Sequence, residues 1–397
     1  MNRGTDGGYG WVAVGAAFTA HFVGFGIIYS FTVFFPSILD EFGRGRGETS
    51  WIVSIAAGLM LGAGGVTGRL SDRWGPGRVL AMGGVLIGSG LLLSSLATSI
   101  WHVYLAYGLA LGLGVACSFV PSVATVGQWF ERRRGLAIGV AVAGTGVGSL
   151  VLAPLSSRLI DAYGWRGAMR VIALIGFVAL LAAGSVLRAR DQPPRGGGAW
   201  AAVRGNRTFV LLYLSSVVAA YGYWIPFFHI VPYAEDRGIT TGSAALLVSI
   251  MGITNTLGRI VMGAVADRVG RRRIMQVSAA ALAIAMFGWP LAGSWAALAV
   301  FGAFYGMFAG AFIALLPALA GDYFGMQRLA GITGLLFTGA ALGTLFGGPV
   351  TGMLFDATGS YTLGIVLGAC GLALGAGLLL PLPDTEHAPL VRSRSSV

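Results

Sequence analysis

Lysine is absent from this chain of 397 residues, and all 26 of its basic residues are arginine. Charged side chains make up only 10% of the sequence, whereas an average soluble domain has about 25%. The two cysteines, Cys117 and Cys370, both lie in apolar stretches and are interpreted as small packing residues. The scarcity of charge argues against a soluble globular fold, and the cysteines give no support for a disulfide framework or a metal site. We predict no metal and no cofactor.

Hydrophobic residues, in contrast, make up 56% of the sequence, and glycine contributes 65 residues. Twelve apolar stretches of about 19–26 residues have the length of tilted transmembrane helices. Abundant glycine fits this setting, because small side chains let helices approach closely in lipid. The stretches are centred near Ala20, Ala57, Leu86, Leu111, Ala143, Phe177, Val217, Ile253, Ala283, Phe304, Phe337 and Gly371. The sequence predicts an all-α membrane protein with twelve transmembrane helices.

The arginines are distributed unevenly among the connections between these stretches. They gather near both ends of the chain and in the even-numbered connections, within residues 69–78, 132–134, 188–207 and 268–273. Because positively charged loops stay on the cytoplasmic side, this pattern predicts a multi-pass protein of the inner (plasma) membrane with both termini in the cytoplasm. The net charge of +11 therefore reports topology, and we predict the lipid bilayer as a partner and no nucleic acid.

The chain contains an internal repeat with a displacement of 195 residues. The segment Gly68-Arg-Leu-Ser-Asp-Arg-Trp-Gly-Pro-Gly-Arg78 recurs as Gly263-Ala-Val-Ala-Asp-Arg-Val-Gly-Arg-Arg-Arg273, and Gly148 recurs as Gly343. A polar stretch rich in arginine, proline and glycine separates the copies and is typical of a flexible linker. We predict two parallel six-helix repeats: an N-terminal bundle over residues 1–187, a cytoplasmic linker over 188–207, and a C-terminal bundle over 208–397 with a short cytoplasmic tail.

One apolar stretch, from Val248 to Gly263, is interrupted by a permanent cation, Arg259. Asn255 precedes it by four residues, so the two side chains project from the same face of a helix. An arginine at this depth costs about 2.5–3.5 kcal/mol, and an anion or a water-filled cavity has to offset that cost. The pattern therefore predicts an anion-binding site. The alternative is a structural arginine that binds backbone carbonyls or extends to the membrane surface.

Parallel six-helix repeats are the arrangement of major facilitator transporters, whose substrate sites lie near the midplane between the two halves. The Asp-Arg loop after the second apolar stretch resembles the short signature of this superfamily between helices 2 and 3. The resemblance implies a gate, in which Asp72 sits at a helix N-terminus and holds the cytoplasmic side shut. We expect Asp72, Arg73, Asp267 and Arg132 to take part in gating; the alternative is that the arginines only set topology.

Two segments resemble the monocarboxylate transporter family more narrowly. Asp6-Gly-Gly-Tyr-Gly-Trp11 is similar to the family's signature before helix 1, and Trp129-Phe-Glu-Arg-Arg-Arg-Gly-Leu-Ala-Ile-Gly139 is similar to its second signature, at the start of helix 5. Arg259 stands where family members carry an essential arginine. The resemblance covers nearly the whole chain and points towards bacterial lactate transporters of this family. It implies alternating-access transport of monocarboxylates such as L-lactate or pyruvate, with proton symport.

The chain departs from well-studied animal members at two positions. Those members have a lysine where this chain has Tyr29, and an aspartate where it has Asn255, so the family's usual proton pathway cannot be carried over. His229 is our candidate for proton coupling and for substrate binding, ahead of His21, since histidine titrates most easily near neutrality. The alternative is a packed, hydrogen-bonded histidine. Tyr29, Tyr223 and Asn255 are candidates to hydrogen-bond the substrate beside Arg259.

A single intramembrane arginine neutralises a single carboxylate, which favours a small monocarboxylate anion and a proton as the partners. The apolar stretch from about Leu329 to Leu354 supplies no second cation of the kind a dianion carrier would need. The alternatives are an organic-anion exchanger of the oxalate/formate type and a non-transporting membrane sensor on the same fold. We predict no enzymatic activity and no catalytic residue, because the sequence has neither paired intramembrane carboxylates nor an activated nucleophile.

Overall fold

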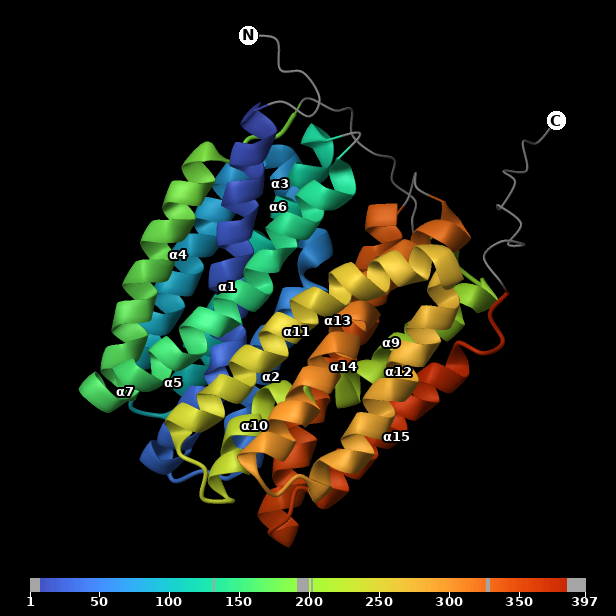
Figure 1. Ribbon diagram of the computed structural model, residues 1–397. Helices are drawn as coiled ribbons and strands as arrows, with labels where there is room; N and C mark the ends of the chain where they lie inside the picture. Colours follow the sequence, from blue (N-terminus) through green and yellow to red (C-terminus); the bar gives the residue numbers. More distant parts are fainter. Residues whose placement is uncertain (1–7, 131–132, 191–199, 201–202, 326–328, 384–397) are drawn as a thin grey trace, which may run out of the picture.

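The computed structural model describes residues 8–130, 133–190, 200, 203–325 and 329–383, and these residues form helices and connecting turns with no strand (Figure 1). The all-α fold predicted from the sequence is therefore confirmed for the described residues. The elements of the first half are α1 (Gly8–Phe42), α2 (Arg46–Gly62), α3 (Gly64–Trp74), α4 (Pro76–Ser95), α5 (Ile100–Val103), the π-helix η1 (Tyr104–Leu111), α6 (Gly112–Trp129) and α7 (Arg134–Val186).

The second half contains α9 (Arg207–Tyr223), α10 (Ile225–Glu235), α11 (Thr241–Val269), α12 (Arg271–Gly288), the 3-10 helix η2 (Trp289–Leu291), α13 (Trp295–Phe324), α14 (Leu329–Thr358) and α15 (Thr362–Leu378). The helix is interrupted at Trp224, since α9 ends at Tyr223 and α10 begins at Ile225, with Pro226 in its first turn. Proline suits this position because its missing N–H would have no helical partner there.

Two elements of the first half are also interrupted. The axes of α2 and α3 meet at a bend of 54°. Within α7, Gly164 has φ 67° and ψ 166°, a backbone conformation outside the helical region. A residue with a Cβ atom is strained at such a positive φ, so glycine permits the break.

The described helices have the lengths that a membrane requires. Nine of them are long and apolar enough to span a bilayer, and the bent pair α2–α3 would make a tenth. This count takes α7 as one span although Gly164 interrupts it, and it leaves out α15, which is short at 17 residues. These helices confirm a multi-pass membrane protein. Their count reaches ten, which is fewer than the twelve spans predicted from the sequence.

The first residues of α1 and the last residues of α15 lie at the same end of the bundle, the upper end in Figure 1. At this end the hydroxyl of Tyr9 donates to the carbonyl oxygen of Val186, and that of Tyr323 donates to the carbonyl oxygen of Pro383. We call this the terminal end and the opposite one the far end. Across the two halves, α2 packs on α14, α7 on α11, and α1 on α10.

Close helix contacts recur with the displacement of the sequence repeat. A Cβ atom at Gly148 on α7 would overlap the carbonyl oxygen of Phe22 on α1. A Cβ atom at Gly343 on α14 would overlap that of Val217 on α9 in the same way. Gly343 follows Gly148 by 195 residues, and Val217 follows Phe22 by the same number. The repeated glycines therefore serve equivalent helix contacts in the two halves.

Candidate functional site

Helix α11 carries the two polar residues predicted to form the site, and its neighbours fix its position. The side chain of Thr240 accepts a hydrogen bond from the N–H of Ser243 and so caps the start of α11. On the packed face, Gly310 of α13 lies so close to Asn255 that a Cβ atom would overlap the Asn255 carbonyl oxygen. The close approach of α13 holds the middle of α11, from which Asn255 and Arg259 project.

A chain of hydrogen bonds links three of the predicted residues. Arg259 donates from Nε to Oδ1 of Asn255 at 3.1 Å, and Asn255 donates from Nδ2 to the hydroxyl of Tyr223 at 3.3 Å. Tyr223 ends α9, so the chain connects two helices. Asn255 and Tyr223 are buried, and Arg259 is half-buried. The structure thus brings together Arg259, Asn255 and Tyr223.

The guanidinium of Arg259 keeps unused hydrogen-bonding capacity inside the protein. Its Nη2 atom is buried and has no hydrogen-bond partner among the described residues. The ion pairs found in the same residues do not include Arg259. Its hydrogen bond goes to a side-chain amide and not to a backbone carbonyl. A buried cation without a counterion is costly, so the position is suited to an anion.

Tyr29 reaches the same region from α1. Its ring stacks on Phe227 at 4.7 Å between centroids and lies 5.8 Å from the Trp224 ring. Tyr223 also packs on Phe227, at 5.7 Å. The hydroxyl of Tyr29 is buried and makes no hydrogen bond within 3.5 Å to the described residues. Aromatic packing at the α9–α10 break therefore places Tyr29 and Tyr223 against the same phenylalanine.

A small cavity of about 30 Å³ adjoins this cluster. Both halves contribute to its walls, with Leu61 of α2 facing Tyr223 and Trp224 of the second half. Phe312 and Phe337 add further apolar surface. The polar end of the site thus lies beside apolar walls, an arrangement that suits a ligand with one charged and one apolar end.

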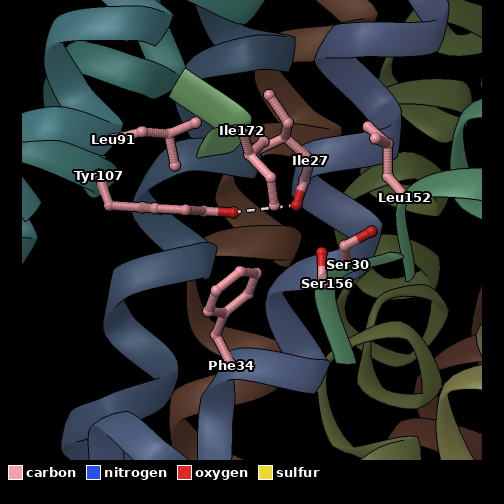
Figure 2. A pocket seen from close by; sticks show the side chains of 8 residues that line it. All are labelled: Ile27, Ser30, Phe34, Leu91, Tyr107, Leu152, Ser156 and Ile172. Atoms are coloured by element: carbon pink, nitrogen blue, oxygen red, sulfur yellow. Dashed lines mark hydrogen bonds between the residues drawn. The ribbon is translucent and has the colours of Figure 1, made fainter. Parts of the chain in front are cut away.

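A smaller cavity of about 10 Å³, the size of a single water molecule, lies within the first half of the chain (Figure 2). The hydroxyls of Ser30 and Ser156 are buried there without hydrogen-bond partners in the described residues. Tyr107 donates to the carbonyl oxygen of Ile27 at 3.0 Å. This cavity contains none of the residues that we predicted for the site.

The structure does not bring His229 to Arg259. His229, on α10, is buried, and its Nε2 lies 3.0 Å from the carbonyl oxygen of Gly348 and 3.4 Å from the hydroxyl of Ser50. Because the carbonyl oxygen can only accept, Nε2 carries the proton. The charged group that acts on the ring is Arg46, at the far end. His229 therefore lies with the residues that connect the two halves at the far end.

Arg46, which starts α2, is the centre of those far-end contacts and was not predicted from the sequence. Its Nη1 and Nη2 donate to the carboxylate of Asp236 at 2.7 and 2.6 Å, and Nη1 also donates to the Tyr361 hydroxyl at 2.7 Å. Burial raises the pKa of Tyr361, so its hydroxyl stays protonated. The carboxylate of Asp356 accepts from the N–H groups of Arg46 and Gly47, capping α2 from the other half.

A signal for this network exists in the repeat. Adding 195 to Glu41 and Arg166, which form an ion pair within the first half, gives Asp236 and Tyr361. The second-half equivalent of Arg166 is therefore a tyrosine, Tyr361. Arg46 from the first half supplies the cation that pairs with Asp236. We name Arg46, Asp236, Tyr361 and Asp356 the far-end lock.

The residues predicted to gate the terminal end are not joined across the halves. Asp72 and Arg73 are exposed, and neither forms an ion pair within the described part of the chain. Asp267 accepts from Arg271, one turn later in the same half. Arg132 lies outside the described residues. In the state observed here, the polar contacts that join the halves in the described residues therefore include the far-end lock but no pair of these gating residues.

The comparisons with known proteins agree with this geometry. The family model described as Major Facilitator Superfamily matches residues 17–233 and 212–395. The chain is also similar to solved structures of a D-xylose–proton symporter (TM-score 0.77, 15% identity, 95% of this chain and 99% of that one) and of a bacterial homologue of the human lysosomal transporter Spinster in an inward-facing, unoccupied conformation (TM-score 0.71, 14% identity, 94% and 95%). These likenesses show the fold.

Sequence relatives are more specific. The chain is 33% identical over 387 residues to monocarboxylate transporter 13 of Rattus norvegicus, covering 95% of this chain and 90% of the relative. It is 33% identical to monocarboxylate transporter 11 of Homo sapiens (95% and 84%) and 31% identical to monocarboxylate transporter 2 of Rattus norvegicus (94% and 83%). The chain belongs to the major facilitator superfamily and, within it, is a membrane transport protein of the monocarboxylate transporter family.

Proposed function

We propose that this protein carries a small monocarboxylate, such as L-lactate or pyruvate, across the inner (plasma) membrane by alternating access, together with a proton. The observation that carries the proposal is the buried, unpartnered Nη2 of Arg259, whose guanidinium is linked through Asn255 to Tyr223 in the wall of an apolar cavity. A carboxylate can accept from the guanidinium there, with Asn255 and Tyr223 holding the guanidinium in orientation.

The size and charge of the substrate follow from the same site. One guanidinium without a second cation nearby matches one carboxylate, and a dianion would leave a buried charge unpaired. The cavity walls of Leu61, Phe312 and Phe337 favour a short apolar group at the other end of the molecule. The three relatives described above are named monocarboxylate transporters, which supports this substrate class.

The proposal includes twelve transmembrane segments in two six-helix halves, residues 1–187 and 208–397, joined by the linker 188–207. Counting α7 as two segments at Gly164, and α15 as a short one, brings ten spans to twelve. The equivalent glycine contacts in the two halves support the repeat. We propose that the terminal end faces the cytoplasm, in agreement with the arginine distribution.

Alternating access then requires the far-end lock to break when the terminal end closes. We assign His229 to this lock rather than to the substrate site, because its contacts with Ser50 and Gly348 lie with Arg46. Asp72, Arg73, Asp267 and Arg132 stay proposed gating residues of the terminal end, and their contacts would form in the opposite state. Tyr29 stays a proposed substrate ligand, since its buried hydroxyl has no hydrogen-bond partner within 3.5 Å among the described residues.

Uptake into proteoliposomes tests the proposal. Purified protein should accumulate labelled L-lactate when the lumen is more alkaline than the outside, and unlabelled pyruvate should compete. Exchange of oxalate for formate without lactate uptake would instead indicate an organic-anion exchanger, and the absence of uptake and exchange with folded protein would favour a sensor. Either result would contradict the proposal.

A further inference from the structure

His21 is a second buried polar residue near Arg259. It lies on α1 with 1% of its surface exposed, and its ring packs on Phe25 at 5.8 Å and edge-on to Phe119 at 5.5 Å. Phe25 in turn packs on Tyr29, at 5.9 Å. Phe119 packs on Phe337, which lines the cavity beside Tyr223, at 6.4 Å. These contacts place His21 in one cluster with Tyr29 and Tyr223, and Asn255 links that cluster to Arg259.

The hydrogen bonds of His21 define which ring nitrogen is free. Nδ1 lies 2.8 Å from the carbonyl oxygen of Ala17, one turn earlier. A carbonyl oxygen can only accept, so Nδ1 carries a proton. Nε2 is buried and has no hydrogen-bond partner in the described residues. In the neutral ring, therefore, Nε2 presents an unsatisfied lone pair inside the protein, which is the atom that would take up a proton.

Two of the elements packed on α1, namely α6 and α10, bring no charged side chain to the His21 ring in the described residues. On α6, Phe119 contacts the ring, while the side chain of Cys117 faces α4 at Gly83. On α10, His229 faces Ser50 and Gly348. Of the charged groups in the described residues, Arg259 of α11 is the one that hydrogen bonds connect to the cluster around Tyr223.

Two charged side chains of α2 and α7 lie at the far end and are paired there. Arg46 of α2 is held by Asp236, and Arg166 of α7 pairs with Glu41. On α1 itself, the titratable neighbour in the group is Tyr29, two turns beyond His21. With the site empty, no described group accepts from Nε2, so a proton added there would lack a hydrogen-bond partner.

We propose that His21 binds the proton that accompanies the substrate anion, and that anion and proton bind cooperatively. This inference rests on the function proposed above and deepens it by naming the coupling residue. The carboxylate that docks on Arg259 brings a negative charge close to His21 and thereby favours the imidazolium. A proton from water adds to the Nε2 lone pair, forming one N–H bond, and this N–H can donate to the carboxylate.

The charge balance of the site explains why coupling would be tight. The empty site holds one positive charge, that of Arg259. An anion alone would reduce the net charge to zero, whereas an anion together with a proton on His21 restores one positive charge. Loaded and empty sites therefore carry the same net charge, so this charge adds a similar electrostatic cost to the movement of either one between the two states of the transporter.

Calorimetry measures the proton directly. Purified protein is titrated with sodium L-lactate at pH 7 in two buffers of different ionisation enthalpy, which gives the number of protons taken up per bound anion. Free lactate is ionised at this pH, so it supplies no proton. We expect uptake of about one proton for the unmodified protein and about one for the matched control His229→Gln. For His21→Gln we expect uptake close to zero, with lactate binding that is weaker but still measurable through Arg259.

A second measurement needs no substitution at His21. Only four histidines are present, so the ring signals of histidine-labelled protein can be assigned, and the His21 ring should become protonated when lactate is added. Proton uptake that is unchanged in folded His21→Gln, or a His21 ring that stays neutral with lactate bound, would overturn the inference and leave the proposed function standing. Failure of the unmodified protein to bind lactate would overturn both.

Discussion

Arg259 and Asn255 stand one turn apart on α11, and the Nε of the arginine donates to the Oδ1 of the asparagine at 3.1 Å. This bond orients the guanidinium without neutralising it, because the amide is uncharged. An aspartate at position 255 would orient Arg259 equally well but would also supply its counterion. The asparagine therefore leaves the positive charge of Arg259 available to a ligand.

Replacing Asn255 tests this distinction. Asn255→Asp places a carboxylate beside Arg259. Animal relatives carry a lysine at the position of Tyr29, but this chain does not, so the new carboxylate would take Arg259 as its partner. We expect lactate binding about 10–100-fold weaker at neutral pH, the equivalent of a charged hydrogen bond of about 1.5–3 kcal/mol. The control Asn255→Ala should weaken binding by only a few-fold. Equal dissociation constants for Asn255→Asp and the unmodified protein, measured by calorimetry, would refute a role for charge.

The far-end lock provides a prediction about conformation. Arg46→Gln removes the bidentate ion pair with Asp236, whose partners are only 16% and 31% exposed. We expect the population with an open far end to rise by a factor of about 5–30, corresponding to about 1–2 kcal/mol. Arg166→Gln is the matched control, because its ion pair with Glu41 lies within one half.

Spin labels can report this change. The exposed residues Thr98 and Ser294 lie in far-end connections of the first and second half, respectively, and can carry the labels after the native cysteines are replaced. The distance distribution between them should shift to longer values in Arg46→Gln and stay unchanged in Arg166→Gln. Identical distributions in all three proteins would show that the Arg46 contacts do not hold the far end closed.

Asp72 provides the corresponding test at the terminal end. Because Asp72 is exposed and forms no ion pair among the described residues, its latch contact would exist only in the opposite state. Asp72→Asn should therefore shift the population towards the state observed here by about 1 kcal/mol, with no loss of thermal stability. Cysteine labelling from each side of the membrane measures this shift. Unchanged accessibility at both ends would leave Asp72 with a topological role only.

The fold and the centre of the site follow directly from local sequence rules. Long apolar stretches predict membrane-length helices, and a spacing of four residues predicts that Asn255 and Arg259 share a helix face. The hydrogen bond between them confirms that shared face. The meeting of Asn255 with Tyr223 required the packing of α9 beside α11, which no local rule provides.

The two histidines show that the depth of a residue along its helix adds information to its chemistry. At about 1.5 Å per residue, His229 lies about 33 Å from Arg207 at the terminal end, beyond the midplane, whereas His21 lies about 20 Å from Gly8. Arg259 lies about 15 Å from the terminal end of α11 at Val269, closer to the depth of His21. Counting residues from the helix ends therefore favours His21 over His229 as the histidine at the depth of Arg259. Residue type alone does not distinguish the two histidines.

The far-end lock could not be predicted from local patterns, because its partners come from both halves. Arg46 and Asp236 are 190 residues apart, and each sits in a short connection that reads as an ordinary polar loop. The repeat gives one indirect sign of the lock. Glu41 pairs with Arg166 in the first half, but the equivalent positions in the second half are Asp236 and Tyr361, so the second half lacks the cation of this pair.

The central claim is that Arg259 binds the carboxylate of the substrate, and the binding of L-lactate to purified Arg259→Gln and Arg259→Lys tests it most directly. Glutamine removes the charge, and lysine replaces a planar fork with a point charge, so we expect no measurable binding for the first and binding at least about tenfold weaker for the second. Matching elution profiles and thermal stability would show that both variants are folded. Unaltered lactate affinity in folded Arg259→Gln would contradict the account.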